Sequence, residues 1–251
     1  MTTKQLPTKL GKEPLIDVVC AVSFESDGPA DALLPGMLLA KLSDKQPKVE
    51  TLPAGQLPDA VRNAVPNLQN APRIRIVLDE KFTVLIGHNL LGVGCLMPYA
   101  GWGEFRPMIE RVFSVLHGAS FIKKISRHSL KYADFIKSTG DDASFSRLNI
   151  QIDVAGRKLS NQVTHLRTEI AEPPFLHLTT ILAPATATPL GGKPSNGTWV
   201  DVDTVRTESF SVDEFLGRLP ELLELIHKAN KSFFFELLSE TGLKELEPQY
   251  D

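Results

Sequence analysis

Histidines and cysteines carry the side chains that most often act as catalysts and metal ligands. In this chain they are His88, His117, His128, His165, His177 and His227, together with Cys20 and Cys95. None of them stands near another His, Cys or carboxylate at the spacing of a structural zinc site. His165 and His177 fall on neighbouring predicted strands and could face each other, although ordinary strand histidines produce the same pattern. The sequence therefore predicts no metal site and no metal cofactor.

Motifs for nucleophilic catalysis and phosphate binding are also missing. There is no Gly-x-Ser-x-Gly elbow, and neither cysteine has a basic neighbour that would activate its thiol. Residues 189–197 contain Gly-Gly-Lys-Pro-Ser, but Pro194 occupies the place of the Ser or Thr that begins the helix of a phosphate loop. Gly92 and Gly94 lack the third glycine of a dinucleotide-binding fingerprint. We expect no catalytic residue and no cofactor.

Two groups of residues could instead bind a partner. Lys123, Arg127 and Lys131 recur every fourth residue, which places them on one face of a strand. That stripe is either an anion- or partner-binding face or a solvated outer face of a sheet. Tyr99 and Trp102 lie in a loop between a predicted strand and a predicted helix, where exposed rings would form a recognition loop. Rings packed onto the start of the helix are the alternative.

The stretch from residue 73 to residue 132 contains the elements that would position these side chains. The sequence predicts four strands in this stretch, at 73–78, 81–86, 90–97 and 121–132, and one helix at 103–116. Within the helix one apolar stripe has the helical period and comprises Phe105, Met108, Ile109, Val112, Phe113 and Leu116. One face of this helix must therefore be covered, and the flanking strands are the obvious cover.

Earlier residues predict a strand at 15–24, a helix that starts after Pro35 and Gly36, a short strand at 49–52 and a loop with helical turns at 53–72. Later residues predict strands at 145–154, 161–170, 175–184 and 199–205. A capping box at Ser211 and Glu214 then begins a long helix, in which Gly217 and Pro220 predict a kink or a break near residue 219.

These elements predict an α+β fold made of two antiparallel sheet-plus-helix halves, with curved sheets packed on long helices. After a polar lead-in at 1–13, the halves cover residues 14–140 and 141–251 and form one compact unit. Each half opens a helix after an extended segment, at residues 102–105 and 212–215, which is the pattern an internal duplication would leave.

Composition narrows the function classes. The formal net charge of −3 argues against a protein built to hold nucleic acid, and 42% apolar with 23% charged residues is typical of a soluble globular protein. No apolar run is long enough to span a membrane, and residues 1–10 lack a hydrophobic signal region. We expect a cytoplasmic protein with a protein partner, no membrane, and buried cysteine thiols; the sequence leaves a homodimer open.

Several short motifs are similar to those of one known family. They are residues 14–19 (PLIDVV) leading to Phe24, residues 99–105 (YAGWGEF), residues 127–132 (RHSLKY) and a closing helix at 234–238. Together they resemble a sporadically distributed bacterial family of uncharacterised proteins of about this length. The resemblance implies no catalytic residue. The patchy distribution of that family implies an accessory role in defence or toxin neutralisation.

Three hypotheses follow. The first is a non-enzymatic binding or adaptor protein, whose candidate binding residues are Tyr99, Trp102, Lys123, Arg127 and Lys131. The second is an antitoxin-like or accessory component of a bacterial defence cassette, which rests on the resemblance alone. The third is an enzyme with an unrecognised site that uses His88, His165, His177 or Asp201.

Overall fold

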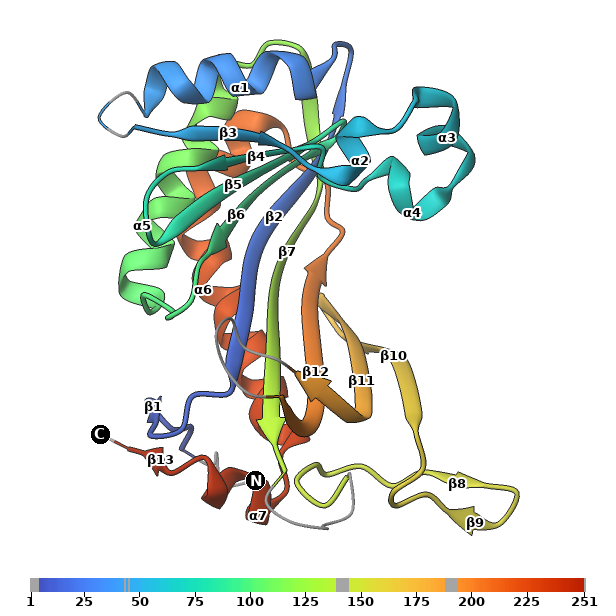
Figure 1. Cartoon of the computed structure of the whole chain (residues 1–251). Coiled ribbons are helices and arrows are strands. Elements are labelled where there is room, and N and C mark those ends of the chain that lie inside the picture. The colour runs from blue at the N-terminus through green and yellow to red at the C-terminus, as the bar shows by residue number, and fades with distance from the viewer. Residues whose placement is uncertain (1–4, 43, 45, 139–144, 188–193, 251) are drawn as a thin grey trace. The chain divides into compact units, whose positions relative to one another are not determined.

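The chain has a mixed α+β fold with a nine-stranded antiparallel sheet in the order β10-β11-β12-β7-β2-β6-β5-β4-β3 (Figure 1). The structure is a computed structural model that describes residues 5–42, 44, 46–138, 145–187 and 194–250. Residues contact one another mostly within two compact units. Unit 1 comprises Met1–Ile16, Lys131–Thr204 and His227–Asp251, and unit 2 comprises Asp17–Leu130 and Val205–Ile226. The units interleave along the chain, and the division at residue 140 and the internal duplication stay predictions.

Unit 2 contains the meander predicted for the central stretch. Its strands are β2 (Leu15–Ser26, from Asp17 onward), β3 (Lys48–Thr51), β4 (Ile74–Val77), β5 (Phe82–Gly87), β6 (Leu90–Cys95) and the first part of β7 (Ile122–Lys137). Antiparallel pairing joins β3 to β4, β4 to β5, β5 to β6 and β6 to β2. The β5–β6 hairpin turns at His88 and Asn89, and its strands are almost wholly buried. The predicted strands in this stretch are confirmed.

Helix α5 (Trp102–Phe113), extended by the 3₁₀ helix η1 (Ser114–Gly118), supplies much of the apolar interior of unit 2. The buried residues of its stripe are Phe105, Ile109, Val112, Phe113 and Leu116, as the sequence predicts. Met108 is only half-buried. The Phe105 ring stacks on Phe82 of β5, with 6.2 Å between centroids. The start of the helix therefore packs against β5.

Helix α1 (Ala30–Lys41) corrects one prediction. The helix does not start after Pro35 and Gly36 but passes through them. Proline removes one intrahelical hydrogen bond, whereas Ala30, Leu34 and Leu38 on one helix face are completely or almost completely buried. Burial of that face outweighs the lost bond. The segment between β3 and β4 holds the short helices α2 (Pro53–Gln56), α3 (Asp59–Ala64) and α4 (Pro66–Gln69), consistent with the predicted loop and helical turns.

Unit 1 contains the second set of predicted strands and the end of the long helix. Its elements are β1 (Lys9–Leu10), β10 (Thr164–Glu172), β11 (Phe175–Ala187), β12 (Ser195–Arg206, to Thr204), the second part of β7, the second part of α6 (Val212–Leu237), α7 (Glu240–Glu245) and β13 (Pro248–Gln249). Its core joins Ile181, Val200 and Val202 of the sheet to Phe233 and Phe234 of α6. The helix is continuous through Pro220, without the predicted break.

Residues 145–154 are not a strand. Within 145–154 only β8 (Asp153–Val154) pairs as a strand, with β9 (Arg157–Lys158). Phe145 and Leu148 belong to the core of unit 1, so their apolar pattern reflects packing of an irregular segment.

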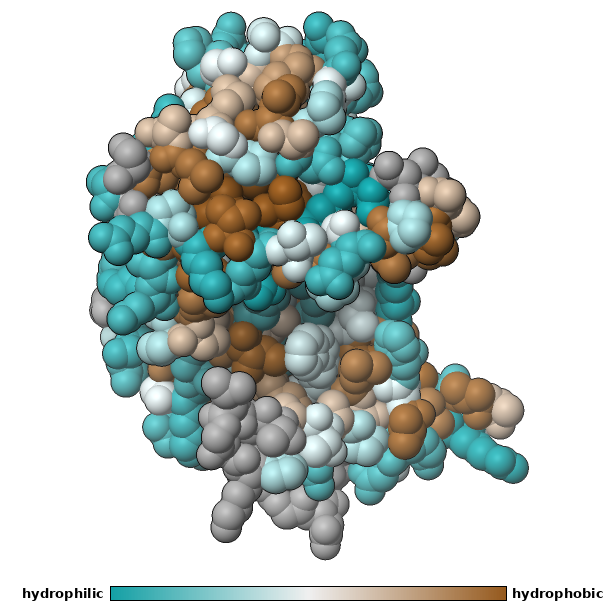
Figure 2. Space-filling view, turned by 45° about the horizontal axis from the view of Figure 1, so that its top comes forward, coloured by the Kyte–Doolittle hydropathy of each residue, from teal (hydrophilic) through white to brown (hydrophobic). Residues whose placement is uncertain are grey.

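The surface mixes polar and apolar side chains. Figure 2 shows hydrophobic patches set among hydrophilic residues on the face it displays. Across the residues that the structure describes, no helix is long and apolar enough to cross a membrane.

Candidate functional site

The loop before α5 packs its rings onto the start of that helix. Gly101 has φ = 84°, a conformation that favours glycine, and the helix begins at the next residue, Trp102. Trp102 and Tyr99 both lie edge-on to the Phe105 ring, with centroids 6.3 and 6.1 Å away. Both side chains are half-buried. This is the packing alternative named above, although part of each ring reaches the surface.

Glu224 of α6 fixes the orientation of the Trp102 indole. Its Oε1 atom accepts a hydrogen bond from Trp102 Nε1 at 3.0 Å and another from Arg106. Arg106 also donates to Glu110 Oε1, 2.9 Å away. The outer surface of α5 is therefore joined to α6 by a network of one indole, one guanidinium and two carboxylates.

Apolar side chains are exposed immediately before these rings. Leu96 and Met97 are each 38% exposed, and both belong to unit 2 with Trp102 and Arg106. We call Leu96, Met97, Tyr99, Trp102 and Arg106 the loop patch. It combines flexible apolar side chains with rings and a guanidinium held in place, which is the composition found at the centres of protein interfaces.

A groove follows the α5–α6 pair away from the loop patch. The two helix segments are antiparallel, because Trp102 and Arg106 contact Glu224 whereas Phe113 contacts Phe215. The groove has a volume of about 580 Å³ and is lined by Leu216, Leu219 and Pro220, among others, with Lys41, His117 and Asp213 also at its wall. The groove therefore has apolar lining residues, together with the basic side chain of Lys41 and the acidic side chain of Asp213.

The predicted basic stripe is divided between the units, and its two lysines are paired with carboxylates. Lys123 Nζ lies 2.8 Å from Asp27 Oδ2 in unit 2, and Lys131 Nζ lies 3.6 Å from Asp201 Oδ2 in unit 1. Arg127 is half-buried. Pairing with carboxylates reduces the positive field expected of an anion-binding stripe. A role for these three residues stays a prediction.

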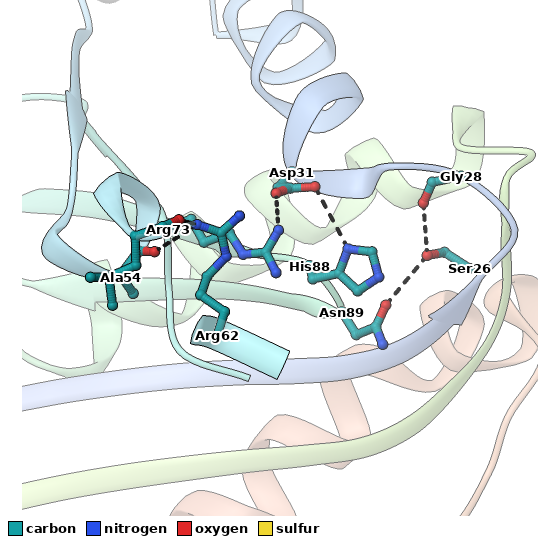
Figure 3. A network of polar contacts seen from close by, with 9 residues as sticks. Ser26, Gly28, Asp31, Ala54, Arg62, Arg73, His88 and Asn89 are labelled. Atoms are coloured by element: carbon teal, nitrogen blue, oxygen red, sulfur yellow. Dashed lines mark hydrogen bonds and ion pairs between the residues drawn. The ribbon is translucent and has the colours of Figure 1, made fainter. Parts of the chain in front are cut away.

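A second polar cluster in unit 2 surrounds Asp31 at the start of α1 (Figure 3). Arg73 Nη1 donates to Asp31 Oδ2 at 2.6 Å, and both side chains are mostly buried. His88 of the β5–β6 turn faces the other carboxylate oxygen, with Nδ1 3.8 Å from Oδ1. This distance is too long for a hydrogen bond. The arrangement resembles a carboxylate–histidine pair, but Asp31 is bound to Arg73 and does not fix the imidazole.

The neighbours of this cluster have structural roles. Ser26 Oγ donates to Gly28 O at 3.1 Å and lies 3.4 Å from Asn89 Oδ1, which links the end of β2 to the hairpin turn. The buried Arg62 donates to the carbonyls of Ala54 and Leu57 in the α2–α3 segment. Asp31 thus joins α1 to Arg73, whereas Arg62 of α3 is bonded to Ala54 of α2 (Figure 3). Sequence reasoning missed Asp31 and Arg73, which are 42 residues apart and have no local motif.

The two most buried histidines are enclosed by other side chains. His128 lies against the rings of Phe210 and Phe215, and burial, followed by the charges of Arg206 and Arg218, lowers its pKa to about 4. In unit 1, His177 stacks on Phe233, with centroids 4.2 Å apart. Both rings have the environment of core residues.

His177 lies in a chain of polar contacts. Its Nδ1 atom lies 2.9 Å from Thr204 Oγ1, which also accepts from Asn230 Nδ2 at 2.9 Å. Its Nε2 atom lies 3.5 Å from Glu172 Oε2. Burial lowers the pKa of His177, and the neighbouring Glu172 opposes that shift. Because His177 and Thr204 are both wholly buried, this carboxylate–histidine–hydroxyl chain has no exposed nucleophile.

The histidine pair that the sequence suggested does not form. In the β10–β11 hairpin His165 is opposite Leu182, and His177 is opposite Ile170. The two histidines are therefore five positions apart along the ladder, and His165 is exposed whereas His177 is buried. Of the two alternatives, that they face each other or are ordinary strand histidines, the first is excluded by the register of the hairpin, which turns at residues 173–174.

Within the described ranges, no group of three or more His, Cys, Asp or Glu side chains is arranged to hold a metal ion. Cys20 and Cys95 are both buried, and no disulfide joins them.

The chain matches no known protein-family model, and no curated protein is similar enough to it to count as a relative. Its resemblance to the sporadically distributed bacterial family, and the defence role which that resemblance implies, therefore stay predictions.

Proposed function

We propose that the protein is a non-enzymatic binding or adaptor protein that takes a protein partner through the loop patch. The observation that carries this proposal is the exposure of Leu96 and Met97 in the segment that leads to Trp102, whose ring Glu224 already holds. Exposed neighbouring apolar side chains are unfavourable in water, and at this place they are next to anchor residues suited to an interface.

Ordering of the patch before binding favours affinity. Each side chain that a partner must immobilise costs about 0.5–1.5 kcal/mol. Trp102 and Arg106 are already held by hydrogen bonds to Glu224, and the Phe105 ring supports the indole. A partner therefore has mainly Leu96 and Met97 to order. Methionine adapts its shape readily, which suits it to the edge of such a contact.

The groove along α5 and α6 extends the same surface. Leu216, Leu219 and Pro220 offer an apolar floor, and Lys41 and Asp213 offer one charge of each sign. We infer that the partner inserts one or two apolar side chains there while its polar groups meet the rim. This arrangement fits a binding protein in which curved antiparallel sheets pack on helices and present a groove to the partner.

A capture experiment in the native host tests the proposal. Tagged wild-type protein is compared with a Leu96→Glu, Met97→Glu double variant by quantitative identification of co-purified proteins. The expected result is one or more partners depleted about tenfold or more with the variant, because two apolar contacts become buried charges. A matched control, Val49→Glu with Val61→Glu, introduces the same charges at exposed apolar sites of unit 2. Equal recovery of every partner by wild type and the loop variant, both folded by circular dichroism, would place the binding surface elsewhere.

The basic stripe is tested in the same capture with Arg127→Ala. If Arg127 contributes to the surface that contains Trp102, recovery of the same partner falls while the fold is retained. Undiminished recovery would remove the stripe from the binding surface and leave the loop patch as its centre.

A further inference from the structure

We propose that the protein forms a symmetric homodimer by antiparallel pairing of β10 with β10 of a second copy, centred on Thr168. This interface lies in unit 1 and uses no residue of the loop patch.

β10 is an open edge of the sheet. It is the terminal strand, paired with β11 alone, and it is nine residues long. Among the residues that the structure describes, no backbone hydrogen bond joins its outer side to another segment. Figure 1 shows β10 as the outermost strand next to β11. Such an edge presents unpaired N–H and C=O groups that another strand can satisfy. At the opposite edge β3 has only four residues and offers a much shorter ladder.

The sequence of β10 is complementary to itself in one register. When Thr168 lies opposite Thr168 of the second copy, Arg167 lies opposite Glu169 and Glu169 lies opposite Arg167. Both side chains are exposed and take part in no ion pair within the described part of the chain. On the other face Leu166 meets Ile170 twice, and Ile170 is 41% exposed in a single copy. Opposite charges and apolar pairs placed directly across antiparallel strands are both stabilising.

Neighbouring registers that keep the same face of both sheets aligned are excluded by charge. A register centred on Arg167 places two guanidinium groups opposite each other, and one centred on Glu169 places two carboxylates opposite each other. Like charges directly opposite are destabilising. A one-residue slip would turn the apolar face of the second copy to the other side of the sheet. Registers centred on Leu166 or Ile170 avoid like charges but lose both Arg167–Glu169 pairs and shorten the ladder. The pairing centred on Thr168 is therefore the one that avoids these conflicts and keeps both ion pairs.

Charge exchange tests the ion pairs. Sedimentation over a range of concentrations should show a wild-type dimer and a dissociation constant about tenfold or more weaker for Arg167→Glu, because two attractive pairs become repulsive. The double variant Arg167→Glu, Glu169→Arg restores both pairs and should restore dimerisation. Arg157→Glu, the same change in exposed β9, should leave the dimer unchanged. Wild type that stays monomeric up to about 1 mM, or a dimer unaffected by Arg167→Glu, would overturn the proposal.

Cysteine cross-linking tests the register independently of affinity. Residues opposite each other in an antiparallel pair have Cα atoms about 4.5–5.5 Å apart, within the range of a disulfide. Thr168→Cys should therefore form a covalent dimer when diamide takes up the two thiol hydrogens. His165→Cys should not, because its two copies would lie about 20 Å apart along the strands. Absence of a Thr168→Cys cross-link in folded protein, or an equal cross-link with His165→Cys, would overturn this register. Neither outcome bears on partner capture by the loop patch.

Discussion

Several ionisable side chains are packed inside the protein, and burial changes their preferred charge state. Removing a charged group from water is costly, so a buried histidine favours its neutral form and a buried carboxyl favours its protonated form. His128, His177 and Asp134 are all buried, and each shows the shift that burial predicts. These shifts give measurable consequences for stability.

His128 should make the protein less stable as the pH falls. Its pKa in the folded protein is about 4, below the ordinary value of 6.5, so the unfolded chain binds its proton first. The contribution of His128 to the free energy of unfolding is therefore largest above pH 6.5, decreases as the pH falls from 6.5 to 4, and then levels off. This shift corresponds to about 3 kcal/mol. Denaturant titrations at several pH values in this range give the free energy of unfolding of wild type and of His128→Phe. This free energy should fall more steeply with decreasing pH in wild type than in the variant. The same pH dependence in both proteins would contradict the buried neutral imidazole.

Asp134 should have the opposite pH dependence. Burial, followed by the charges of Glu13 and Asp201, raises the pKa of its carboxyl well above 3.8. The unfolded chain therefore loses this proton at lower pH than the folded chain. The contribution of Asp134 to the free energy of unfolding decreases as the pH rises above 3.8, the ordinary pKa that the carboxyl has in the unfolded chain. Asp134→Asn removes the titration and should unfold at a higher temperature than wild type at neutral pH, with the difference shrinking toward pH 4. A variant less stable at every pH would mean that the carboxylate is ionised and paired.

The face of β7 on which these residues lie could not be predicted from alternation. His128, Ser129 and Leu130 are consecutive and all buried, and residues 133–136 are buried as well. When both faces of a strand are covered, alternation of polar and apolar residues no longer indicates which face is exposed to solvent. The spacing of Lys123, Arg127 and Lys131 therefore indicated which residues share a face of β7, but not that residues 128–130 and 133–136 are buried.

Among the elements, those with a long uninterrupted pattern could be predicted and those shaped by distant contacts could not. Helix α5 combines a complete apolar stripe with a glycine at the preceding residue, and its burial followed the prediction. In α1 the helix continues across Pro35 because Leu34 and Leu38 are buried. Residues 145–152 look apolar enough for a strand, yet they join the core of unit 1 mostly through side chains. Tertiary packing overrode the local signal in both places.

Phe113 of α5 measures how much this helix contributes to stability. Its ring is fully buried and lies 6.3 Å from the ring of Phe215. Phe113→Ala should lower the free energy of unfolding by about 3–5 kcal/mol, through lost burial and the cavity left behind. Met108→Ala, a change at a half-buried position of the same helix, should cost clearly less. Equal denaturation midpoints for Phe113→Ala and wild type would show that the helix is not part of the core.

At the scale of the whole molecule, the sites depend on contacts between residues that are far apart in the chain. Trp102 and Glu224 are 122 residues apart, and Asp31 and Arg73 are 42 apart. The sequence could indicate that Trp102 stands in a loop before a helix, but not which side chain would hold its indole. It likewise indicated strands in both parts of the chain, whereas the compact units combine segments from the beginning, middle and end. Long-range pairing of this kind has no local signature.

We predict that the protein needs no metal for its stability, and this can be tested directly on the whole chain. The histidines of the described residues have separate surroundings: His128 is among phenylalanines, His177 stacks on Phe233, and His88 faces a carboxylate that Arg73 already binds. The exposed pair His117–Asp213, with Nδ1 3.2 Å from Oδ1, supplies only two ligands, fewer than the three or four protein ligands of zinc sites.

Protein washed with chelator should therefore contain no stoichiometric zinc or iron by elemental analysis and should unfold at the same temperature as unwashed protein. His117→Ala serves as the control for weak surface binding and should remove any residual zinc uptake without changing that temperature. A stoichiometric metal whose removal lowers the unfolding temperature would show that ligands from different parts of the chain meet at a site that the local spacing does not reveal.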